Sequence, residues 1–355
     1  LRSNGNPPPH TGGFRSAPTA VSWLDAGATS VVLGTAAVPE VLRKLPRERV
    51  VAALDAVEGE VVVEGWKRRT GVDVATRMRA LHGHVSGFLV TFVEREGRQA
   101  GVDLEEVERL ADIAGEAELT VAGGIASPAE VAALDRMGVH AQVGMALYTG
   151  TMSLADAMAA PLVSDRPDGL WPTVVTDSRG RCLGLAWSSA ASLRAAIEEQ
   201  AGIYHSRRRG LWRKGETSGN CQELLRVAAD CDRDALRFTV RQQGGFCHTG
   251  DRSCFGPDGG LGALEHRIGE RSRTRPEGSY TCRLFDDPEL LTAKLLEEAA
   301  ELAEAADRSA VIHEAADVFY FAMVKLADAG VQLADVEREL DMRSRRITRA
   351  GGSGR

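Results

Sequence analysis

The sequence predicts three successive domains: an α/β domain with a parallel sheet, a small α+β domain and an all-α domain. Over residues 1–160, short apolar runs alternate with helix-like segments, which indicates right-handed crossover units around a parallel sheet. Residues 171–256 combine strand-like runs with one amphipathic segment, and residues 260–348 are mainly helical in pattern. These ranges are the predicted domain boundaries.

Composition and charge are those of soluble globular proteins. Of the 355 residues, 43% are apolar and 26% are charged, and the net charge of −7 gives no electrostatic reason to expect nucleic-acid binding. No run of 18 apolar residues occurs, so we expect no membrane span. Six cysteines are few for this length, which favours metal binding in a reducing compartment and hence a cytoplasmic protein. The chain starts without Met, as a fragment of a longer protein would.

The first domain is predicted from five strand-like and four helix-like segments. Apolar runs predict strands within residues 30–38, 49–57, 87–93, 118–125 and 141–148. Amphipathic patterns predict helices within residues 39–45, 74–82, 104–115 and 128–138.

The elements of the second and third domains are predicted from the same kinds of sequence pattern. Residues 174–187 predict two strands around a Ser-Arg-Gly turn, and residues 188–202 predict a helix that begins at cap-type serines and stops at Gly202. Residues 235–242 alternate as a strand. A short helix is expected over 261–272, and the region from 288 to 346 is helical with breaks near 307–309 and at Gly330.

A row of aspartates suggests a site for a hard cation. Asp230, Asp232 and Asp234 alternate, so on a strand their carboxylates would project to one face and Cys231 to the other. Clustered carboxylates suit Mg²⁺, which prefers oxygen ligands and keeps waters for substrate phosphates. The alternative is a solvated strand edge or turn without a metal.

Three cysteines within the same region suggest a zinc site. Cys231, Cys247 and Cys254 supply three thiolates and leave a fourth position open, as catalytic zinc sites do. His248 follows one of these cysteines and could move a proton from zinc-bound water. The segment that precedes both motifs is cationic and rich in hydroxyl groups. Its candidate substrate contacts are Arg207, Arg213, Lys214, Glu216, Thr217 and Ser218, although basic surface loops are also common without a ligand.

The segments LWRKGETSGN, DCDRD and CHTGDRSC resemble phosphoribosyl-AMP cyclohydrolase, the third enzyme of histidine biosynthesis, over residues 171–256. That family opens the adenine ring by attack of water. The resemblance implies Mg²⁺ at the three aspartates. It also implies a homodimer in which Cys231 of one subunit and Cys247 and Cys254 of the other share a zinc ion.

Acidic residues on two consecutive helices predict a second cation site. Glu297, Glu298 and Glu301 precede Glu314 and Asp317, and a helical hairpin could aim these carboxylates at one point. Such a cluster holds Mg²⁺ against a polyphosphate and positions an attacking water. Lys294 is a candidate substrate contact on the same helix. The alternative is a solvated acidic face.

The pattern EExxE followed by ExxD, with SYTCRLFDDPELLTAK upstream, resembles phosphoribosyl-ATP pyrophosphohydrolase over residues 260–348. That family belongs to the all-α nucleotide pyrophosphatases and catalyses the second step of the same pathway. The resemblance implies release of pyrophosphate and delivery of phosphoribosyl-AMP to the cyclohydrolase.

WLDAGATSVVLGTAAV, VEGW and VAGGIASPAEVAAL resemble the (β/α)₈ isomerase of the fourth step. The chain begins near the third strand of that barrel, and Phe92 stands where a catalytic aspartate is expected. The resemblance therefore implies a degenerate barrel without isomerase activity. Gly123, Gly124 and Gly144 are candidates for residual phosphate binding.

The order of the three domains resembles the N-terminal part of the fungal multifunctional histidine-biosynthesis proteins, without the histidinol dehydrogenase domain. We therefore expect a bifunctional hydrolase that acts on phosphoribosyl nucleotides with Zn and Mg²⁺. One alternative is a general nucleoside triphosphate pyrophosphatase with a non-catalytic scaffold portion, which would need no cysteine cluster. A second alternative is a chain that is a scaffold or allosteric module throughout.

Overall fold

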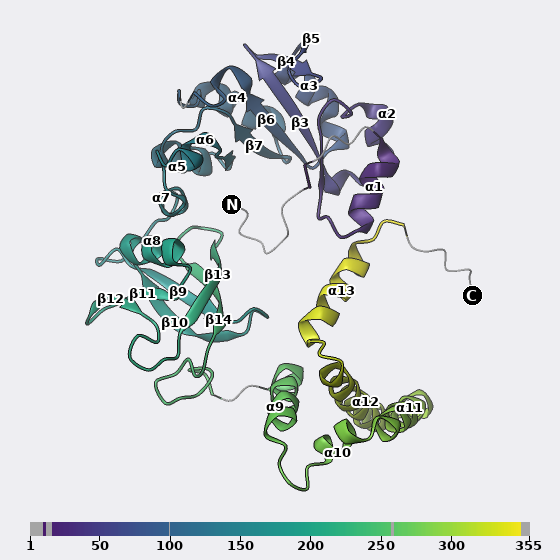
Figure 1. Cartoon of the computed structure of the whole chain (residues 1–355). Coiled ribbons are helices and arrows are strands. Elements are labelled where there is room, and N and C mark those ends of the chain that lie inside the picture. Colours follow the sequence, from purple (N-terminus) through teal and green to yellow (C-terminus); the bar gives the residue numbers. More distant parts are fainter. Residues whose placement is uncertain (1–9, 12–15, 99, 257–258, 349–355) are drawn as a thin grey trace. The chain divides into compact units, whose positions relative to one another are not determined.

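The computed structural model describes residues 10–11, 16–98, 100–256 and 259–348 (Figure 1). It divides into two compact units, residues 1–250 with 345–355 and residues 251–344. Within the first unit, the two predicted β-containing domains have separate sheets and separate hydrophobic cores. The second unit is helical, so the predicted order of α/β, α+β and all-α domains is confirmed.

The first sheet is built from parallel strands that lie in chain order. They are β1 (His10–Thr11), β2 (Val31–Leu33), β3 (Val50–Val57), β6 (Gly87–Phe92), β7 (Glu118–Ala122) and β8 (His140–Gln142). Neighbours in chain order also pair in a (β/α) barrel wall. Among the described strands the order ends at β1 and β8, which do not pair with each other. Among the described residues, the sheet is thus open at both edges.

Helices and short 3₁₀ turns connect these strands. They are α1 (Ala17–Asp25), α2 (Pro39–Leu42), η1 (Arg47–Arg49), α3 (Val74–Leu81), η2 (His82–His84), η3 (Val93–Arg95), α4 (Leu104–Ala114), α5 (Pro128–Arg136), α6 (Met145–Tyr148) and α7 (Leu154–Ala159). The predicted strand at 141–148 is only partly correct. It ends at Gln142, and the apolar residues from Met145 onward form the short helix α6 after Gly144.

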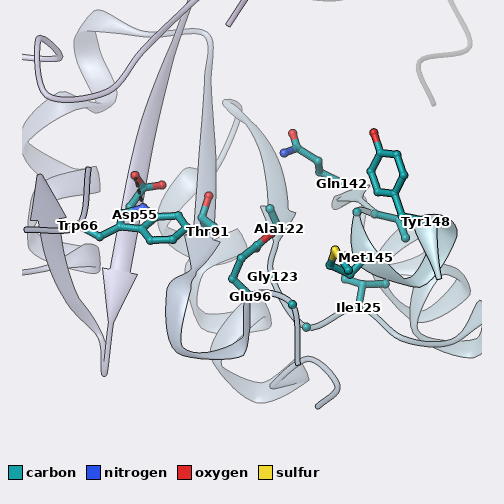
Figure 2. A pocket seen from close by; sticks show the side chains of 14 residues that line it. Asp55, Trp66, Thr91, Glu96, Ala122, Gly123, Ile125, Gln142, Met145 and Tyr148 are labelled. Carbon is teal, nitrogen blue, oxygen red and sulfur yellow. Dashed lines mark hydrogen bonds between the residues drawn. The ribbon is translucent and has the colours of Figure 1, made fainter. Parts of the chain in front are cut away.

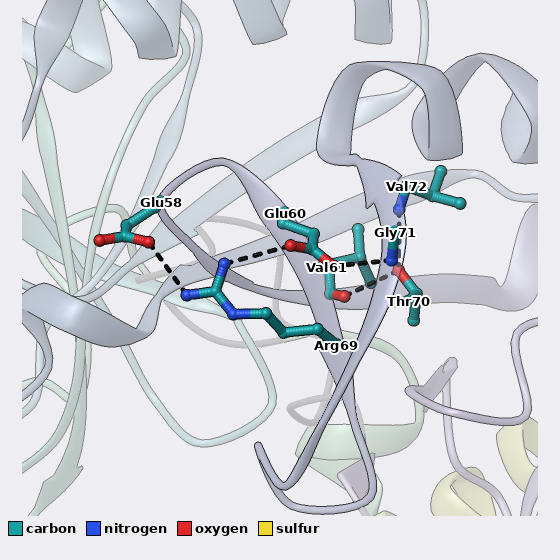
Figure 3. A network of polar contacts seen from close by, with 7 residues as sticks. All are labelled: Glu58, Glu60, Val61, Arg69, Thr70, Gly71 and Val72. Carbon is teal, nitrogen blue, oxygen red and sulfur yellow. Dashed lines mark hydrogen bonds and ion pairs between the residues drawn. The ribbon is translucent and has the colours of Figure 1, made fainter.

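An antiparallel hairpin, β4 (Glu60–Val63) and β5 (Arg68–Asp73), extends from the end of β3 and was not predicted. The two-residue turn Glu58-Gly59 has positive φ at both positions, which is the geometry of a type I′ hairpin turn. Arg69 pairs with Glu58 at 2.9 Å and with Glu60 at 3.1 Å (Figure 3). Glu60 also accepts the backbone N–H of Gly71, and this hydrogen bond and Arg69 lower its pKa.

The second sheet has the order β10-β9-β14-β13. Its strands are β9 (Trp171–Thr176), β10 (Cys182–Ser188), β13 (Gln222–Ala229) and β14 (Leu236–Gln242). Helix α8 (Ala190–Glu199) begins after the predicted cap Ser189 and ends before Gly202, because Gln200 adopts a left-handed φ of 50°. The hairpin of β11 (Ile203–Ser206) and β12 (Gly210–Arg213) forms a separate two-stranded sheet.

The second unit consists of α-helices. They are α9 (Gly260–Thr274), α10 (Tyr280–Asp286), α11 (Pro288–Glu304), α12 (Arg308–Asp328) and α13 (Leu333–Arg345), the last of which ends at the border of the unit. Asp307 caps α12 by accepting the N–H groups of Ser309 and Ala310, and Gly330 follows its end with a φ of 69°. Both predicted breaks are thereby confirmed. None of the helices in the described ranges is long and apolar enough to cross a membrane.

Candidate active sites

The aspartate loop, residues 230–235, connects β13 to β14. Asp230, Asp232 and Asp234 do not lie on a strand, the condition under which their carboxylates were expected to share a face, because β13 ends at Ala229 and Arg233 has a left-handed φ of 68°. One oxygen of Asp230 accepts the N–H groups of Asp234 and Ala235, each at 3.1 Å, and so closes the loop. The carboxylates nevertheless gather, since one oxygen from each aspartate lies within 4.8 Å of the others.

The electrostatics of this loop favour a cation. The negative charge of Asp232 raises the pKa of Asp234, and partial desolvation and Asp230 act in the same direction. Asp232 and Asp234 are exposed, whereas Asp230 is half-buried. Three oxygen donors at this separation fit the ligand preference of Mg²⁺, which would relieve their mutual repulsion.

The three predicted zinc ligands lie in different segments. Cys231 is exposed in the aspartate loop, and its Sγ is 3.8 Å from Oδ1 of Asp232, so it does not face away from the aspartates as the strand prediction required. Cys247 lies after β14, with Sγ 3.6 Å from Nδ1 of the exposed His248. Cys254 is exposed in the second unit. In the described part of a single chain, the ligand groups close enough for one ion are carboxylates, not these thiols.

Most of the substrate-binding residues predicted for this domain lie on and after β12, and Arg207 lies in the turn before it. Lys214 is only 7% exposed, and its Nζ is 5.3 Å from the ring centroid of Phe246. Gly215 has a φ of 85°, and an added Cβ would meet the backbone of Asn220 at 2.4 Å, so this close turn requires glycine. Glu216, Thr217 and Ser218 are exposed in the turn that follows.

The two predicted arginines of this region already have partners. Arg207 is exposed, and its guanidinium carbon lies 5.5 Å from the ring centroid of Trp187. Arg213 forms an ion pair with Glu199 of α8. The region therefore combines one buried lysine with exposed polar groups.

The second carboxylate cluster spans the neighbouring helices α11 and α12. Oxygens of Glu298, Glu301 and Glu314 lie within 4.8 Å of one another, and Glu298 is only 8% exposed. The charge of Glu314 is the main cause that raises the pKa of Glu301. Nζ of Lys294 lies 3.5 Å from Glu298, one helical turn away. This donor set also fits Mg²⁺.

Two predicted acidic residues stand outside this three-glutamate cluster. Glu297 pairs with Lys294 at 2.9 Å, and this hydrogen bond raises the pKa of Lys294. Asp317 lies 3.6 Å from Nε2 of His313 on its own helix. The helical hairpin thus brings together three of the five predicted carboxylates, Glu298, Glu301 and Glu314.

A pocket of about 420 Å³ lies at the carboxyl ends of the parallel strands (Figure 2). The predicted glycines Gly123, Gly124 and Gly144 all line it. Asp55 and Trp66 also line it, joined by a hydrogen bond from the indole Nε1 to Asp55 at 3.0 Å. Sequence reasoning missed these two, and the β4–β5 hairpin that carries Trp66 was not predicted either. The described lining contains no Lys or Arg, and phosphate binding here stays a prediction.

Three family models match successive parts of the chain. Residues 9–153 match the model "Histidine biosynthesis protein", residues 184–256 match "Phosphoribosyl-AMP cyclohydrolase", and residues 261–344 match "Phosphoribosyl-ATP pyrophosphohydrolase". The aspartate loop lies inside the second match and the glutamate cluster inside the third. The two carboxylate clusters therefore fall in two different families of hydrolase.

Curated relatives show the same combination. A "Histidine biosynthesis trifunctional protein" of Neurospora crassa is 48% identical over 206 residues, which cover 58% of this chain and 24% of that protein. A bifunctional relative of Schizosaccharomyces pombe is 46% identical over 58% of this chain and 49% of its own length. The "Histidine biosynthesis bifunctional protein HisIE" of Deinococcus radiodurans is 40% identical over 50% of this chain and 89% of its length. The chain thus spans about a quarter of the Neurospora protein.

Proposed function

Because the chain belongs to the family of bifunctional histidine-biosynthesis proteins, we propose that it hydrolyses phosphoribosyl-ATP and then opens the adenine ring of the product. The observation that carries this proposal is the presence of two separate carboxylate clusters, one in each hydrolase domain. The first reaction consumes water and gives phosphoribosyl-AMP and pyrophosphate. The second consumes another water and breaks a ring bond of the adenine.

The pyrophosphohydrolase step is assigned to the glutamate cluster of α11 and α12. Glu298, Glu301 and Glu314 would hold Mg²⁺, which when bound neutralises the charge of a polyphosphate. Lys294 lies one turn before Glu298 and can pair with a substrate phosphate, at the cost of its present contact with Glu297. The buried position of Glu298 supports this assignment, because a carboxylate shielded from water gains most from a bound cation.

The cyclohydrolase step is assigned to the aspartate loop and the cysteines. The three aspartates would hold Mg²⁺, and Cys231, Cys247 and Cys254 would hold zinc, which supplies a water of lowered pKa when it is bound. His248 lies next to Cys247 and can accept a proton from the attacking water. Lys214 and the turn that follows it would contact the phosphoribosyl groups.

We further propose a homodimer in which subunits share the zinc ligands. The exposure of Cys231 and Cys254 supports this, since thiols at the surface of one chain are accessible to a second chain. Reduced thiolates of this kind suit the cytoplasm, where we propose that the enzyme works.

The alternative function is a general nucleoside triphosphate pyrophosphatase with a scaffold portion. It would use the glutamate cluster but leave the cysteines without a role. The test is an anaerobic assay of the purified, metal-loaded chain with phosphoribosyl-ATP, in which pyrophosphate release and absorbance are followed together. The proposal predicts both signals in sequence. Pyrophosphate release from many nucleotides without any ring opening would favour the alternative.

A further inference from the structure

An ion pair joins helix α5 of the α/β domain to the aspartate loop. Asp135 lies in the last turn of α5, and Arg233 lies in the loop 98 residues later. Nη2 of Arg233 is 2.8 Å from Oδ1 of Asp135, and Nε is 3.2 Å from each carboxylate oxygen. A two-nitrogen contact of this kind fixes the orientation of both groups.

Arg233 is also tied to the backbone of the loop and of the preceding connector. Its Nη1 donates to the carbonyl oxygen of Asp230 at 2.9 Å, and its own carbonyl oxygen accepts the N–H of Val163 at 2.9 Å. Its φ of 68° is a left-handed conformation that normally favours glycine. These contacts hold a non-glycine residue in the conformation that turns the chain between Asp232 and Asp234.

The ion pair between Asp135 and Arg233 is partly buried. The side chains of Asp135 and Arg233 are 28% and 24% exposed, so water screens their attraction only in part. An acidic group in the last turn of a helix is disfavoured by the helix dipole, and Arg233 offsets that cost. A second ion pair between the same two domains, Asp156 with Arg194, involves no residue of the aspartate loop and is more exposed.

We propose that Asp135 is a positioning residue for the three carboxylates of the aspartate loop, acting through Arg233. The α/β domain then takes part in the cyclohydrolase step by holding the metal-binding loop of the next domain. This inference deepens the proposed cyclohydrolase function and rests on it. When the pair is lost, the turn at Arg233 relaxes, the carboxylates separate and Mg²⁺ binds less tightly.

The test compares Asp135→Asn with Asp156→Asn in the whole 355-residue chain. For Asp135→Asn we expect the Mg²⁺ concentration at half-maximal ring opening to rise about tenfold, the scale seen for residues that orient metal ligands. Pyrophosphate release from phosphoribosyl-ATP should stay unchanged and serves as an internal control. For Asp156→Asn both activities should match those of the unmodified chain.

Metal binding is measured independently of activity. Binding of Mn²⁺, followed by electron paramagnetic resonance, is compared in chains that also carry Glu314→Gln, so that the glutamate cluster is weakened in every sample. Asp135→Asn should weaken Mn²⁺ binding at the remaining site about tenfold, and Asp156→Asn should not. Asp135→Glu should restore part of the loss, because it keeps the charge.

Arg233→Gly covers the case in which Asp135→Asn fails to fold. Glycine adopts a φ of 68° without strain, so this variant should fold, but it lacks the guanidinium that fixes the turn through Asp135 and Asp230. It should weaken Mn²⁺ binding as Asp135→Asn does, with no further loss in the double variant. Equal Mn²⁺ binding by Arg233→Gly, Asp135→Asn and Asp156→Asn would overturn the positioning role. Absence of ring opening in the unmodified chain would instead refute the cyclohydrolase function, while the Mn²⁺ comparison still decides the role of Asp135.

Discussion

Glu314 of α12 raises the pKa of Glu301 of α11, because their carboxylates and that of Glu298 converge within 4.8 Å. Two helices that pack only for stability would be more stable if these like charges were kept apart. The arrangement therefore destabilises the helical unit unless a cation is bound. The repulsion between these carboxylates lies in the domain that matches a pyrophosphohydrolase, and such unfavourable clustering of charge is typical of a functional site.

The raised pKa of Glu301 predicts how stability depends on pH in the absence of metal. A carboxylate with a higher pKa in the folded chain keeps its proton longer when folded. The folded state then loses stability as pH rises from the ordinary value of 4.5 through the raised pKa. In EDTA, we expect Glu301→Gln to have a higher melting temperature than the unmodified chain above this interval, and Mg²⁺ to reverse the order. Thermal melting, monitored by circular dichroism, checks this expectation, with Glu304→Gln as the matched control on the same helix. Equal melting temperatures of the two variants in EDTA would contradict the repulsion.

Glu314→Gln tests the role of the cluster in catalysis. The change keeps the size of the side chain but removes a charged ligand, so pyrophosphate release should fall by at least about 100-fold. Ring opening of added phosphoribosyl-AMP should be retained, since the aspartate loop lies in another domain. Both rates are measured on one preparation. An equal fall in pyrophosphate release in Glu304→Gln would argue against a separate pyrophosphohydrolase site. Loss of both activities in folded Glu314→Gln would argue against it as well.

The sequence was most informative where structure depends on local pattern. Helices α11 and α12 and their break at Asp307 follow from periodicity and a capping side chain, so the glutamate cluster could be expected from spacing alone. Strands β2, β3, β6 and β7 of the parallel sheet are apolar runs and were predicted for the same reason, whereas β1 was not predicted.

Other features depend on geometry that spacing does not determine. The alternation of Asp230, Asp232 and Asp234 correctly predicted that the carboxylates meet, but the cause is a tight loop rather than a strand. The pairing of Asp135 with Arg233 joins residues 98 positions apart and depends on how two domains pack. Glu297 and Asp317 have suitable spacing, yet neighbouring side chains engage them outside the cluster.

Cys247→Ser tests the thiolate site. A serine hydroxyl is a poor zinc ligand, so the zinc content measured by mass spectrometry should fall and ring opening should drop by at least about 100-fold. Pyrophosphate release should be unaffected. Cys182→Ser, a change at an exposed cysteine of β10, is the matched control and should retain zinc. Full zinc content together with full ring opening in Cys247→Ser would remove this cysteine from the site.

Lys214→Met tests the buried cation beside Phe246. Methionine keeps most of the apolar stem in this 7% exposed position but cannot pair with a phosphate. We expect the KM for phosphoribosyl-AMP to rise about tenfold to 100-fold, the range for loss of a charged hydrogen bond. Steady-state kinetics with added phosphoribosyl-AMP measure this. An unchanged KM in a variant with unchanged melting temperature would assign Lys214 to packing alone.

The central claim is that one chain carries two separate hydrolytic centres that act in turn on a single nucleotide. The most direct measurement is ring opening from phosphoribosyl-ATP in an equimolar mixture of Glu314→Gln and Cys247→Ser. Neither variant should complete the conversion alone, because each lacks one step. The account predicts that the mixture regains ring opening, as phosphoribosyl-AMP released by one variant is consumed by the other. A mixture that stays inactive, while each variant still performs its own remaining step, would contradict it.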